Sequence, residues 1–345
     1  MSLTRKSVLA IARVLFLVAP WVFIAYLFRD VDAVTNAFEE ASPAPMVGGL
    51  VLTLVGLVSA ALLWTRLVGH LSRDAAVPDT PHLLRSFARS WLARYLPGKI
   101  WSYGARVVHT DATVTPRRIV ATSLVDEFAL MIGTAIALGL GLWVWSAVGP
   151  AAGVPLLIAG AALVVVAMSR LDRLVALALR FLAHAIPERW RRAAEEMQRA
   201  ADEPGLGLKA SALFTGGYLA TNFILGLAFV LIVLSVSDID AADVPLLAGG
   251  YSLAGVVGIL AFVAPAGLGV REGVLVGFLA PVVPSPVAAS LAILVRVVTV
   301  ATDVTFLALV EAFGMVGPRA TKKPAAGSTH NNEPGVGAPA DQSGR

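Results

Sequence analysis

Charged residues and cysteine are what this sequence has least of. Asp, Glu, Lys and Arg make up 14% of its 345 residues, against roughly 25% in soluble domains. That shortage excludes a soluble globular enzyme and a protein that coats nucleic acid. The absence of cysteine excludes disulfides, thiolate metal sites and cysteine nucleophiles. The five histidines include no pair four residues apart, so neither a metal site nor a cofactor is expected.

Long apolar runs occupy most of the chain. Hydrophobic residues make up 57% of it, and the mean hydropathy is +0.78. A helix needs about 20 residues to cross the roughly 30 Å hydrocarbon layer of a membrane. Six runs meet this length, at 8–28, 46–70, 119–147, 150–169, 210–236 and 244–263.

Two further apolar pieces are irregular. Val270–Val283 is too short to cross unaided, and Val287–Val316 is long enough to need tilt or a break. Counting both as crossings gives about eight. The sequence therefore predicts an all-α polytopic membrane protein, with one integral membrane domain over residues 1–316.

Lys and Arg gather on alternate connections. Of the 27, 23 lie in the N-terminal segment (Arg5, Lys6 and Arg13), in 72–118, in 169–209 or after residue 316. Since cytoplasmic loops retain Lys and Arg, both termini are predicted to be cytoplasmic, in a bacterial cytoplasmic membrane. The four exceptions are Arg29 on the opposite side and Arg66, Arg271 and Arg296 within runs. The opposite connections are acidic, with Asp30, Asp32, Glu39, Glu40, Asp238, Asp240 and Asp243.

The basic connections are not plain loops. In His82–Leu96 the apolar residues recur at helical spacing, and Arg85 and Arg89 share another sector. This pattern predicts an amphipathic helix on an anionic leaflet, or one that gathers substrate. Leu171–Ile186 repeats this pattern and 188–203 mixes both charge signs, so 170–209 should hold cytoplasmic amphipathic and solvated helices. Residues 317–345 are predicted to be a disordered cytoplasmic tail.

The membrane pattern is broken at two places. Residues 94–106, RYLPGKIWSYGAR, hold an aromatic stretch too short to cross, which predicts a re-entrant hairpin from the cytoplasmic side. Residues 264–273, APAGLGVREG, interrupt an apolar run just before a charged pair. Irregular backbone survives at membrane depth only where protein or trapped water satisfies it, so both breaks predict a cavity. The residues expected to break the helices are Pro97, Gly98, Pro265, Gly267 and Gly269.

The two breaks occupy corresponding places. Each follows two apolar runs and precedes a third, in the halves 1–169 and 210–316, and each reads Pro, Gly and then a cation. This weak similarity between the halves suggests two parallel repeats with a site between them.

Ionisable residues near the breaks and inside the runs are the second signal. Each costs roughly 2.5–3.5 kcal/mol at the bilayer centre, so it usually faces a bundle interior or a wet cavity. Arg296 and Asp303 face the same way but are about 10 Å apart along a helix, so they can share a cavity without pairing. The candidate substrate-binding residues are Lys99, Arg106, Asp126, Glu127, Arg271, Glu272, Arg296 and Asp303.

Some of these charges have a purely structural alternative. Asp126 and Glu311 lie near the cytoplasmic ends of their runs, where either could snorkel or form an ion pair between helices. We favour that interpretation for Glu311 and Arg66. Asn222, in the middle of a run, is expected to join helices rather than bind a ligand.

Four segments together resemble a known family. They are YLPGKIW followed by Arg106, SLVDEF at 123–128, PAGLGVREGVL at 265–275, and Arg296 in the final run. The combination resembles the lysylphosphatidylglycerol synthase transmembrane-region family, also called flippase-like domain proteins, over about residues 8–316. In its best-understood relative, the multiple peptide resistance factor, the region precedes an aminoacyl-transferase domain and is assigned the movement of aminoacylated phosphatidylglycerol to the outer leaflet. Only 29 residues follow residue 316, so the resemblance implies the translocating half without the synthetic half.

The leading hypothesis is a flippase-like transporter for a phospholipid or a lipid-linked polar head group, without a catalytic residue. Arginine suits a lipid phosphate because its planar fork binds two oxygens, and carboxylates suit an amine or hydroxyls. Membrane lipids are the expected partners, and nucleic acid is not. The candidate phosphate ligands are Arg106, Arg271 and Arg296, and the candidate amine or hydroxyl ligands are Asp126, Glu127 and Glu272.

Two other functions remain open at this point. One is a membrane enzyme acting on a lipid carrier, although the sequence contains no P-loop and no large soluble domain for a nucleotide donor. The other is a proton-coupled carrier of small amphiphiles, in which Glu127 or Asp303 would titrate.

Overall fold

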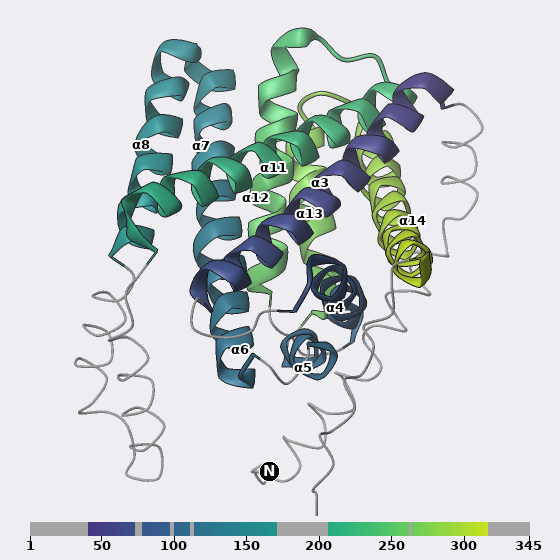
Figure 1. The fold of residues 1–345 in the computed structure, drawn as a ribbon. Coiled ribbons are helices and arrows are strands. Elements are labelled where there is room, and N and C mark those ends of the chain that lie inside the picture. Colours follow the sequence, from purple (N-terminus) through teal and green to yellow (C-terminus); the bar gives the residue numbers. More distant parts are fainter. Residues whose placement is uncertain are drawn as a thin grey trace, which may run out of the picture.

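The structure is a computed structural model in which the regular elements of the described part are all helical (Figure 1). Six of the helices in that part are long and apolar enough to cross a membrane. The predicted all-α polytopic architecture is therefore confirmed. The described residues are 41–72, 78–96, 100–110, 114–170, 206–261 and 264–316.

Several predicted features lie outside these ranges. They are the first apolar run at 8–28, the residues Pro97, Gly98 and Lys99, the two helices predicted within 171–205, and the tail at 317–345.

Five long helices form the body of the bundle. The helices α7 (Ile132–Val148) and α8 (Pro150–Ser169) run side by side, and α3 (Pro43–Leu71) and α11 (Gly207–Val236) pack together obliquely across them (Figure 1). The helix α12 (Val244–Leu260) packs against α7. These two helices approach closely, because a Cβ atom on Gly139 would lie 3.1 Å from the carbonyl oxygen of Gly249. Small residues at such crossings let membrane helices pack backbone to backbone.

The predicted run 119–147 is one continuous helical rod with a widened turn inside it. The helix α6 (Pro116–Leu124) leads into the π-helical segment η3 (Val125–Met131), which continues as α7. Asn222 of α11 donates from Nδ2 to the Met131 carbonyl at 3.2 Å and to Thr134 Oγ1 at 2.8 Å. The prediction that Asn222 joins helices is confirmed. Single π turns of this kind often accompany functional sites.

The predicted hairpin around residues 94–106 consists of two short packed helices. They are α4 (Thr80–Leu92), extended by the 3₁₀ turn η2 (Ala93–Tyr95), and α5 (Ile100–His109). Figure 1 shows both nearly end-on, across the direction of α7 and α8. The side chain of Asp79 caps α4 by accepting from the His82 amide at 3.3 Å, the usual role of Asp before a first turn.

The prediction that α4 lies on the lipid leaflet is wrong. Its apolar side is covered by protein, and Leu83 and Phe87 are each only 1% exposed. The Phe87 ring lies 5.7 Å from that of Trp64 on α3 and 6.4 Å from that of Phe306 in the last helix. Helical periodicity revealed the apolar face, but it cannot distinguish a lipid surface from other helices as the partner of that face.

The second predicted break separates α12 from α13 (Val270–Leu279). The 3₁₀ turn η5 (Pro265–Gly267) lies between them. Gly267 has a φ of +69°, and a Cβ there would lie 2.6 Å from the Gly258 Cα, so only glycine fits. Gly269, with a φ of +81°, begins α13.

The two irregular C-terminal pieces differ in length. The helix α13 has ten residues and is not among the six candidate spans, so counting 270–283 as an eighth crossing is not supported. The helix α14 (Ser285–Val316) is unbroken over 32 residues and runs obliquely in Figure 1. Tilt, rather than a break, therefore accommodates its length.

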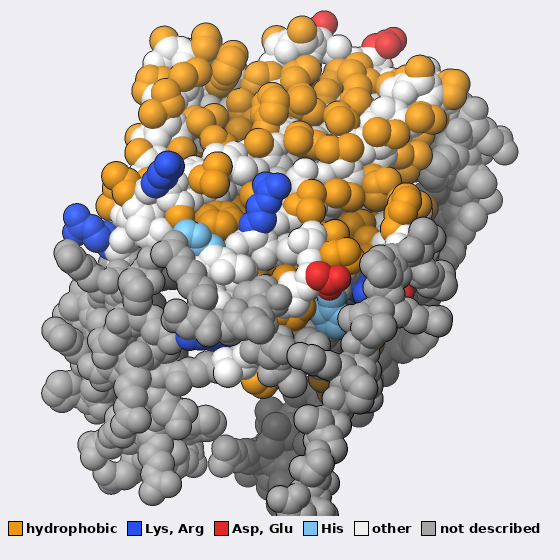
Figure 2. All heavy atoms as spheres, in the orientation of Figure 1, with side chains coloured by type: hydrophobic (Ala, Val, Ile, Leu, Met, Phe, Trp, Pro, Cys, Tyr) orange, Lys and Arg blue, Asp and Glu red, His pale blue; other side chains and the backbone are white. Residues whose placement is uncertain are grey.

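Charge is distributed unevenly over the bundle. Figure 2 shows acidic side chains at one end of a broad apolar face and basic ones towards the other. We call the end where α3 finishes and α11 begins the basic end, since it carries Arg66, His70 and Lys209. The acidic end is the connection from α11 to α12, with Asp238, Asp240 and Asp243. This asymmetry matches the one deduced from the sequence, and the cytoplasmic placement of the basic end remains a prediction.

Candidate functional site

A polar cavity of about 170 Å³ lies inside the bundle, where the α4–α5 hairpin meets η3, α12, η5 and α14. Its wall combines small and apolar residues of α3, α11 and α12 with a group of charged side chains. Such a concentration at membrane depth is costly and usually functional. The charged lining residues are Arg94, Arg106, Asp126, Glu127, Arg271, Arg296 and Asp303.

Most of the predicted site residues meet at this cavity. Six of the eight line it, all of them except Glu272 and Lys99. Glu272 contacts the lining residue Arg296, and Lys99 lies outside the described residues. Arg296 and Asp303 share the cavity without a direct pair, as their spacing on one helix predicts.

The two broken segments meet each other at the cavity. The turn η2 contacts η5, and Arg296 of α14 bridges the two. Its Nη1 donates to the Ala266 carbonyl at 3.3 Å, and its Cζ lies 5.3 Å from the centre of the Tyr95 ring. The irregular backbone that the sequence predicts at both places thus encloses one common site.

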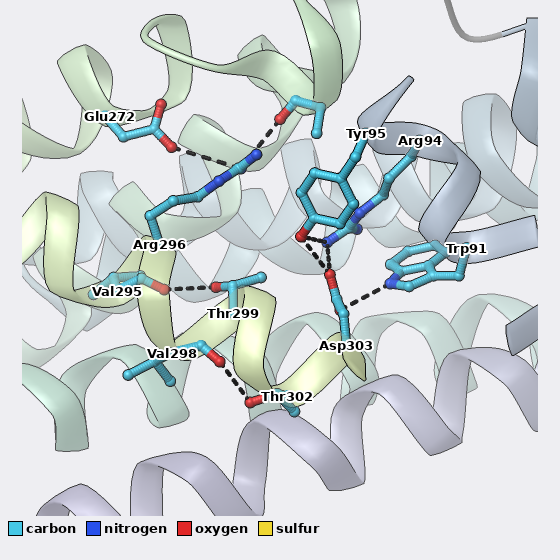
Figure 3. Close-up of polar contacts among 11 residues, drawn as sticks. Trp91, Arg94, Tyr95, Glu272, Val295, Arg296, Val298, Thr299, Thr302 and Asp303 are labelled. Atoms are coloured by element: carbon cyan, nitrogen blue, oxygen red, sulfur yellow. Dashed lines mark hydrogen bonds and ion pairs between the residues drawn. The ribbon is translucent and has the colours of Figure 1, made fainter. Parts of the chain in front are cut away.

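Asp303 is the centre of a polar cluster between the hairpin and α14 (Figure 3). Its Oδ1 accepts from Trp91 Nε1 at 3.0 Å, and its Oδ2 accepts from Arg94 Nη2 and from the Tyr95 hydroxyl, each at 2.6 Å. Burial alone would lower the pKa of Arg94, but Asp303 and Tyr95 outweigh burial and raise this pKa above its ordinary value. Arg94 therefore remains charged, and Asp303 fastens the end of α4 to α14.

Arg106 and Asp126 form a buried ion pair between α5 and η3. The Arg106 Nη1 lies 3.2 Å from Asp126 Oδ2, and each side chain is about nine-tenths buried or more. The Tyr218 hydroxyl donates to the other oxygen of Asp126. The Arg106 guanidinium also lies over the rings of Trp64 and Phe87, at 5.0 and 4.7 Å. The ion-pair alternative is thus confirmed for Asp126. The Arg106 guanidinium already has protein partners, namely this carboxylate and the two rings.

Glu127 lies beside Asp126 on the same π-helical turn and faces the hairpin. Its Oε2 accepts a hydrogen bond from the Tyr103 hydroxyl of α5. Burial, with Glu127 next in effect, raises the pKa of Tyr103 above its ordinary value. Tyr103 therefore keeps its proton and remains a donor to the cavity wall.

Glu272 holds the start of α13 and faces Arg296. Its Oε2 accepts from the Gly269 amide at 2.7 Å, and its Oε1 lies 3.6 Å from Arg296 Nη1. The Glu272 side chain thus stabilises the first turn of α13 and turns its remaining oxygen towards the cavity cation.

Arg271 is the cavity cation whose charge is least balanced by neighbouring acidic groups. Its Cζ lies 4.7 Å from the centre of the Tyr251 ring, and it has no carboxylate partner within the described part of the chain. Its Nε is buried without a hydrogen-bond partner, and so is Nη2 of Arg296. Both guanidinium groups line the same cavity. This corner of the cavity is therefore electropositive and has unsatisfied donors, which an anion would satisfy.

Two other charges within spans lie apart from the cavity. Glu311 accepts from Arg89 Nε at 2.6 Å in a partly exposed pair, so the ion-pair interpretation of Glu311 is confirmed. Arg66 is exposed on α3 beside a second groove.

Sequence reasoning did not identify several residues that build the site. Arg94 begins the broken segment 94–106, yet it is not among the residues predicted to bind substrate. The aromatic residues gave no separate signal because apolar runs are rich in them. The residues missed are Trp91, Arg94, Tyr95, Tyr103, Tyr218 and Tyr251.

Comparison with known proteins gives one family. The family described as "Lysylphosphatidylglycerol synthase TM region" matches residues 8–306. A search of curated proteins finds no match.

Proposed function

Since the chain belongs to the lysylphosphatidylglycerol synthase TM-region family, whose name associates it with lipid, we propose that it is a flippase-like transporter. It moves the polar head group of a phospholipid or of a lipid-linked compound between the leaflets of a bacterial cytoplasmic membrane. The six apolar helices among the described residues make it a multi-pass membrane protein. The basic end, with both termini, faces the cytoplasm in this proposal.

The observation that carries the proposal is a pair of cavity arginines whose positive charges and buried donors are only partly matched by acceptors. Arg271 and Arg296 present buried donors without partners, and within the described ranges Glu272 is the one carboxylate that pairs with either of them. Leaving charged donors unsatisfied is expensive, and a phosphate offers several acceptor oxygens to two guanidinium forks. Arg106 supports the positive potential but is engaged by Asp126. The phosphate of the head group is therefore bound mainly by Arg271 and Arg296.

The carboxylates on the η3 side suit the rest of a head group. Glu127 lines the cavity with the Tyr103 hydroxyl on one of its oxygens. A carboxylate and a phenol at one wall can receive an amine or hydroxyls, while the arginines at the other end hold the phosphate. A head group with both features would span the cavity.

The dimensions of the cavity favour passage of a head group alone. A space of about 170 Å³ suits a small polar group and is too small for a lipid with its chains. The acyl chains would stay in the bilayer, against the apolar outer surface of the helices. Broken helices at membrane depth are what such a polar passage needs, since their free backbone groups line a wet space.

Translocation in liposomes tests this proposal. Purified protein is reconstituted with a trace of phosphatidylglycerol, phosphatidylethanolamine or polyprenyl phosphate that carries a fluorescent label on its hydrocarbon chain, and dithionite quenches the label in the outer leaflet. In protein-free liposomes, dithionite should remove only the fluorescence of the outer leaflet. With the protein present, the proposal predicts that the lost fraction exceeds the outer-leaflet share for at least one of these lipids. Equal curves with and without protein for every lipid would contradict it. Turnover of a lipid-linked donor by the purified protein would instead favour the membrane enzyme.

A further inference from the structure

A second groove lies on the outer surface of the bundle, apart from the central cavity. It has a volume of about 870 Å³ and runs between the last turns of α3 and the first turns of α11, at the basic end. Gly216 and Gly217 line it, and a Cβ on Gly216 would meet nothing within 4 Å. A Cβ on Gly217 would lie 2.6 Å from a Leu63 methyl carbon, so it is at Gly216 that the missing side chain leaves the space open.

Three basic residues surround this groove, and no carboxylate is among its described lining residues. Arg66 and His70 come from α3, and Lys209 comes from α11. Neither Arg66 nor Lys209 has an acidic partner in the described ranges. His70 stands edge-on to the Phe214 ring, with 6.0 Å between the ring centres. Figure 2 shows basic side chains interrupting the apolar surface over α3 and α11.

The sides of the groove are apolar and open to the bilayer. Leu208 and Leu213 of α11 are 65% and 73% exposed, and both line the groove with Leu63 of α3. Arg66 lies five residues before the end of α3, about 7.5 Å inside it. Its side chain can therefore reach the head-group level while its stem lies along the groove.

We propose that this groove binds an acidic phospholipid of the leaflet at the basic end. The phosphate lies among Arg66, His70 and Lys209, and an acyl chain follows Leu63, Leu213 and the two glycines. Charge complementarity selects the acidic lipid, because basic pockets between membrane helices attract anionic head groups. A protein partner would leave these cations facing an apolar contact unless it brought carboxylates of its own.

This inference does not rest on the proposed function. The groove shares no residue with the central cavity, and binding there requires no translocation. The two ideas can therefore fail independently. Central-cavity variants such as Arg271→Gln should leave binding in the groove unchanged.

A labelled lipid and a single introduced cysteine test the inference. The native chain has no cysteine, so Leu213→Cys carries a fluorophore at one place only. The protein is reconstituted in phosphatidylcholine with nitroxide-chain phosphatidylglycerol or nitroxide-chain phosphatidylcholine at equal mole fractions. We expect phosphatidylglycerol to quench the label more strongly at low mole fraction. At Leu163→Cys, an exposed position of α8 outside the groove, the two lipids should quench equally.

Charge and shape variants complete the test. Each Lys or Arg near an anionic head contributes about five-fold in affinity, so Arg66→Gln with Lys209→Gln should remove most of the preference. Arg85→Gln on α4, which removes a cation outside the groove, is the control for these charge variants and should leave the preference unchanged. Gly216→Leu fills the groove and should exclude both lipids from the label. Equal quenching by the two lipids at Leu213→Cys, or a preference that survives the double variant, would overturn the proposal. Absence of quenching by either lipid would overturn it as well, because the groove would then be closed to the bilayer.

Discussion

Arg94 donates to the Asp303 carboxylate at 2.6 Å, and this contact joins two segments that are 209 residues apart in the chain. It fixes the end of the α4–α5 hairpin to the middle of α14, beside the turn η5. The hairpin thereby closes one wall of the central cavity. The cavity therefore depends on α4, which is too short to cross a membrane, being held against the long helix α14.

The variant Asp303→Asn should loosen the hairpin. Arg94 would lose its carboxylate, and hydrogen bonds to charged groups contribute about 1.5–3 kcal/mol. We expect the slow amides of α4 to exchange about 10 to 100 times faster in hydrogen–deuterium exchange. Thr305→Val, at an exposed position of α14, should leave that exchange unchanged. Unchanged exchange in Asp303→Asn would show that Arg94 and Asp303 do not hold the hairpin.

Breaking the buried Arg106–Asp126 pair should cost stability. Removing one partner of a buried pair leaves an uncompensated charge, at about 3–5 kcal/mol. Arg106→Gln and Asp126→Asn should each lower the free energy of unfolding in detergent by about this amount. The double variant should recover part of the loss, since neither charge then remains alone. The partly exposed pair of Arg89 and Glu311 is the control, because Glu311→Gln should change stability by less than about 1 kcal/mol.

A pH gradient should not drive the transport. Each carboxylate among the described lining residues already accepts from a donor, namely Arg106 for Asp126, Tyr103 for Glu127 and Arg94 for Asp303. Each carboxylate is thus engaged in holding the cavity wall, and the proposed movement of a head group requires no proton transfer. Translocation rates in liposomes with and without an imposed gradient should agree. Acceleration by the gradient, lost in Glu127→Gln, would instead identify a proton-coupled carrier.

Arg271 should determine the affinity for the phosphate. Arg271→Gln removes a charged donor, so the half-saturating lipid fraction should rise about 10 to 100 times. Arg271→Lys keeps the charge but loses the planar fork, and its effect should be intermediate. Translocation rates at increasing lipid fraction measure both, with Arg85→Gln as the control. Wild-type behaviour of Arg271→Gln would remove this residue from the site.

The parts of the site that could be predicted are those whose burial in a membrane carries a clear free-energy cost. Arg271, Glu272 and Arg296 are conspicuous because charge inside an apolar run is expensive. The breaks at 94–106 and 264–273 are conspicuous because free backbone groups at membrane depth need partners. Each of these costs is visible in a short stretch of sequence, and so is the succession of spans.

The parts that could not be predicted depend on distant packing. The π-helical turn at Val125–Met131 requires a donor for its displaced carbonyl, which Asn222 supplies from 91 residues away. Arg94 becomes a cavity residue only because α4 turns its aromatic side to α3 and α14 instead of to lipid. Tyr95, Tyr103 and Tyr218 act through their hydroxyl groups and Tyr251 acts through its ring. Nothing in the local pattern distinguishes these tyrosines from the apolar side chains around them.

The most direct test of the account fills the cavity without touching its charges. Gly255 of α12 lines the cavity, and a Cβ there would meet nothing within 4 Å, so Gly255→Leu should occupy the passage and leave the fold intact. Gly277 of α13 also faces open space but lies outside the cavity lining, which makes Gly277→Leu the matched control. The measurement is the translocation rate of the two variants in the same liposomes. A rate close to that of protein-free liposomes for Gly255→Leu, with a wild-type rate for Gly277→Leu, is the predicted result, and equal wild-type rates for both would contradict passage of the head group through this cavity.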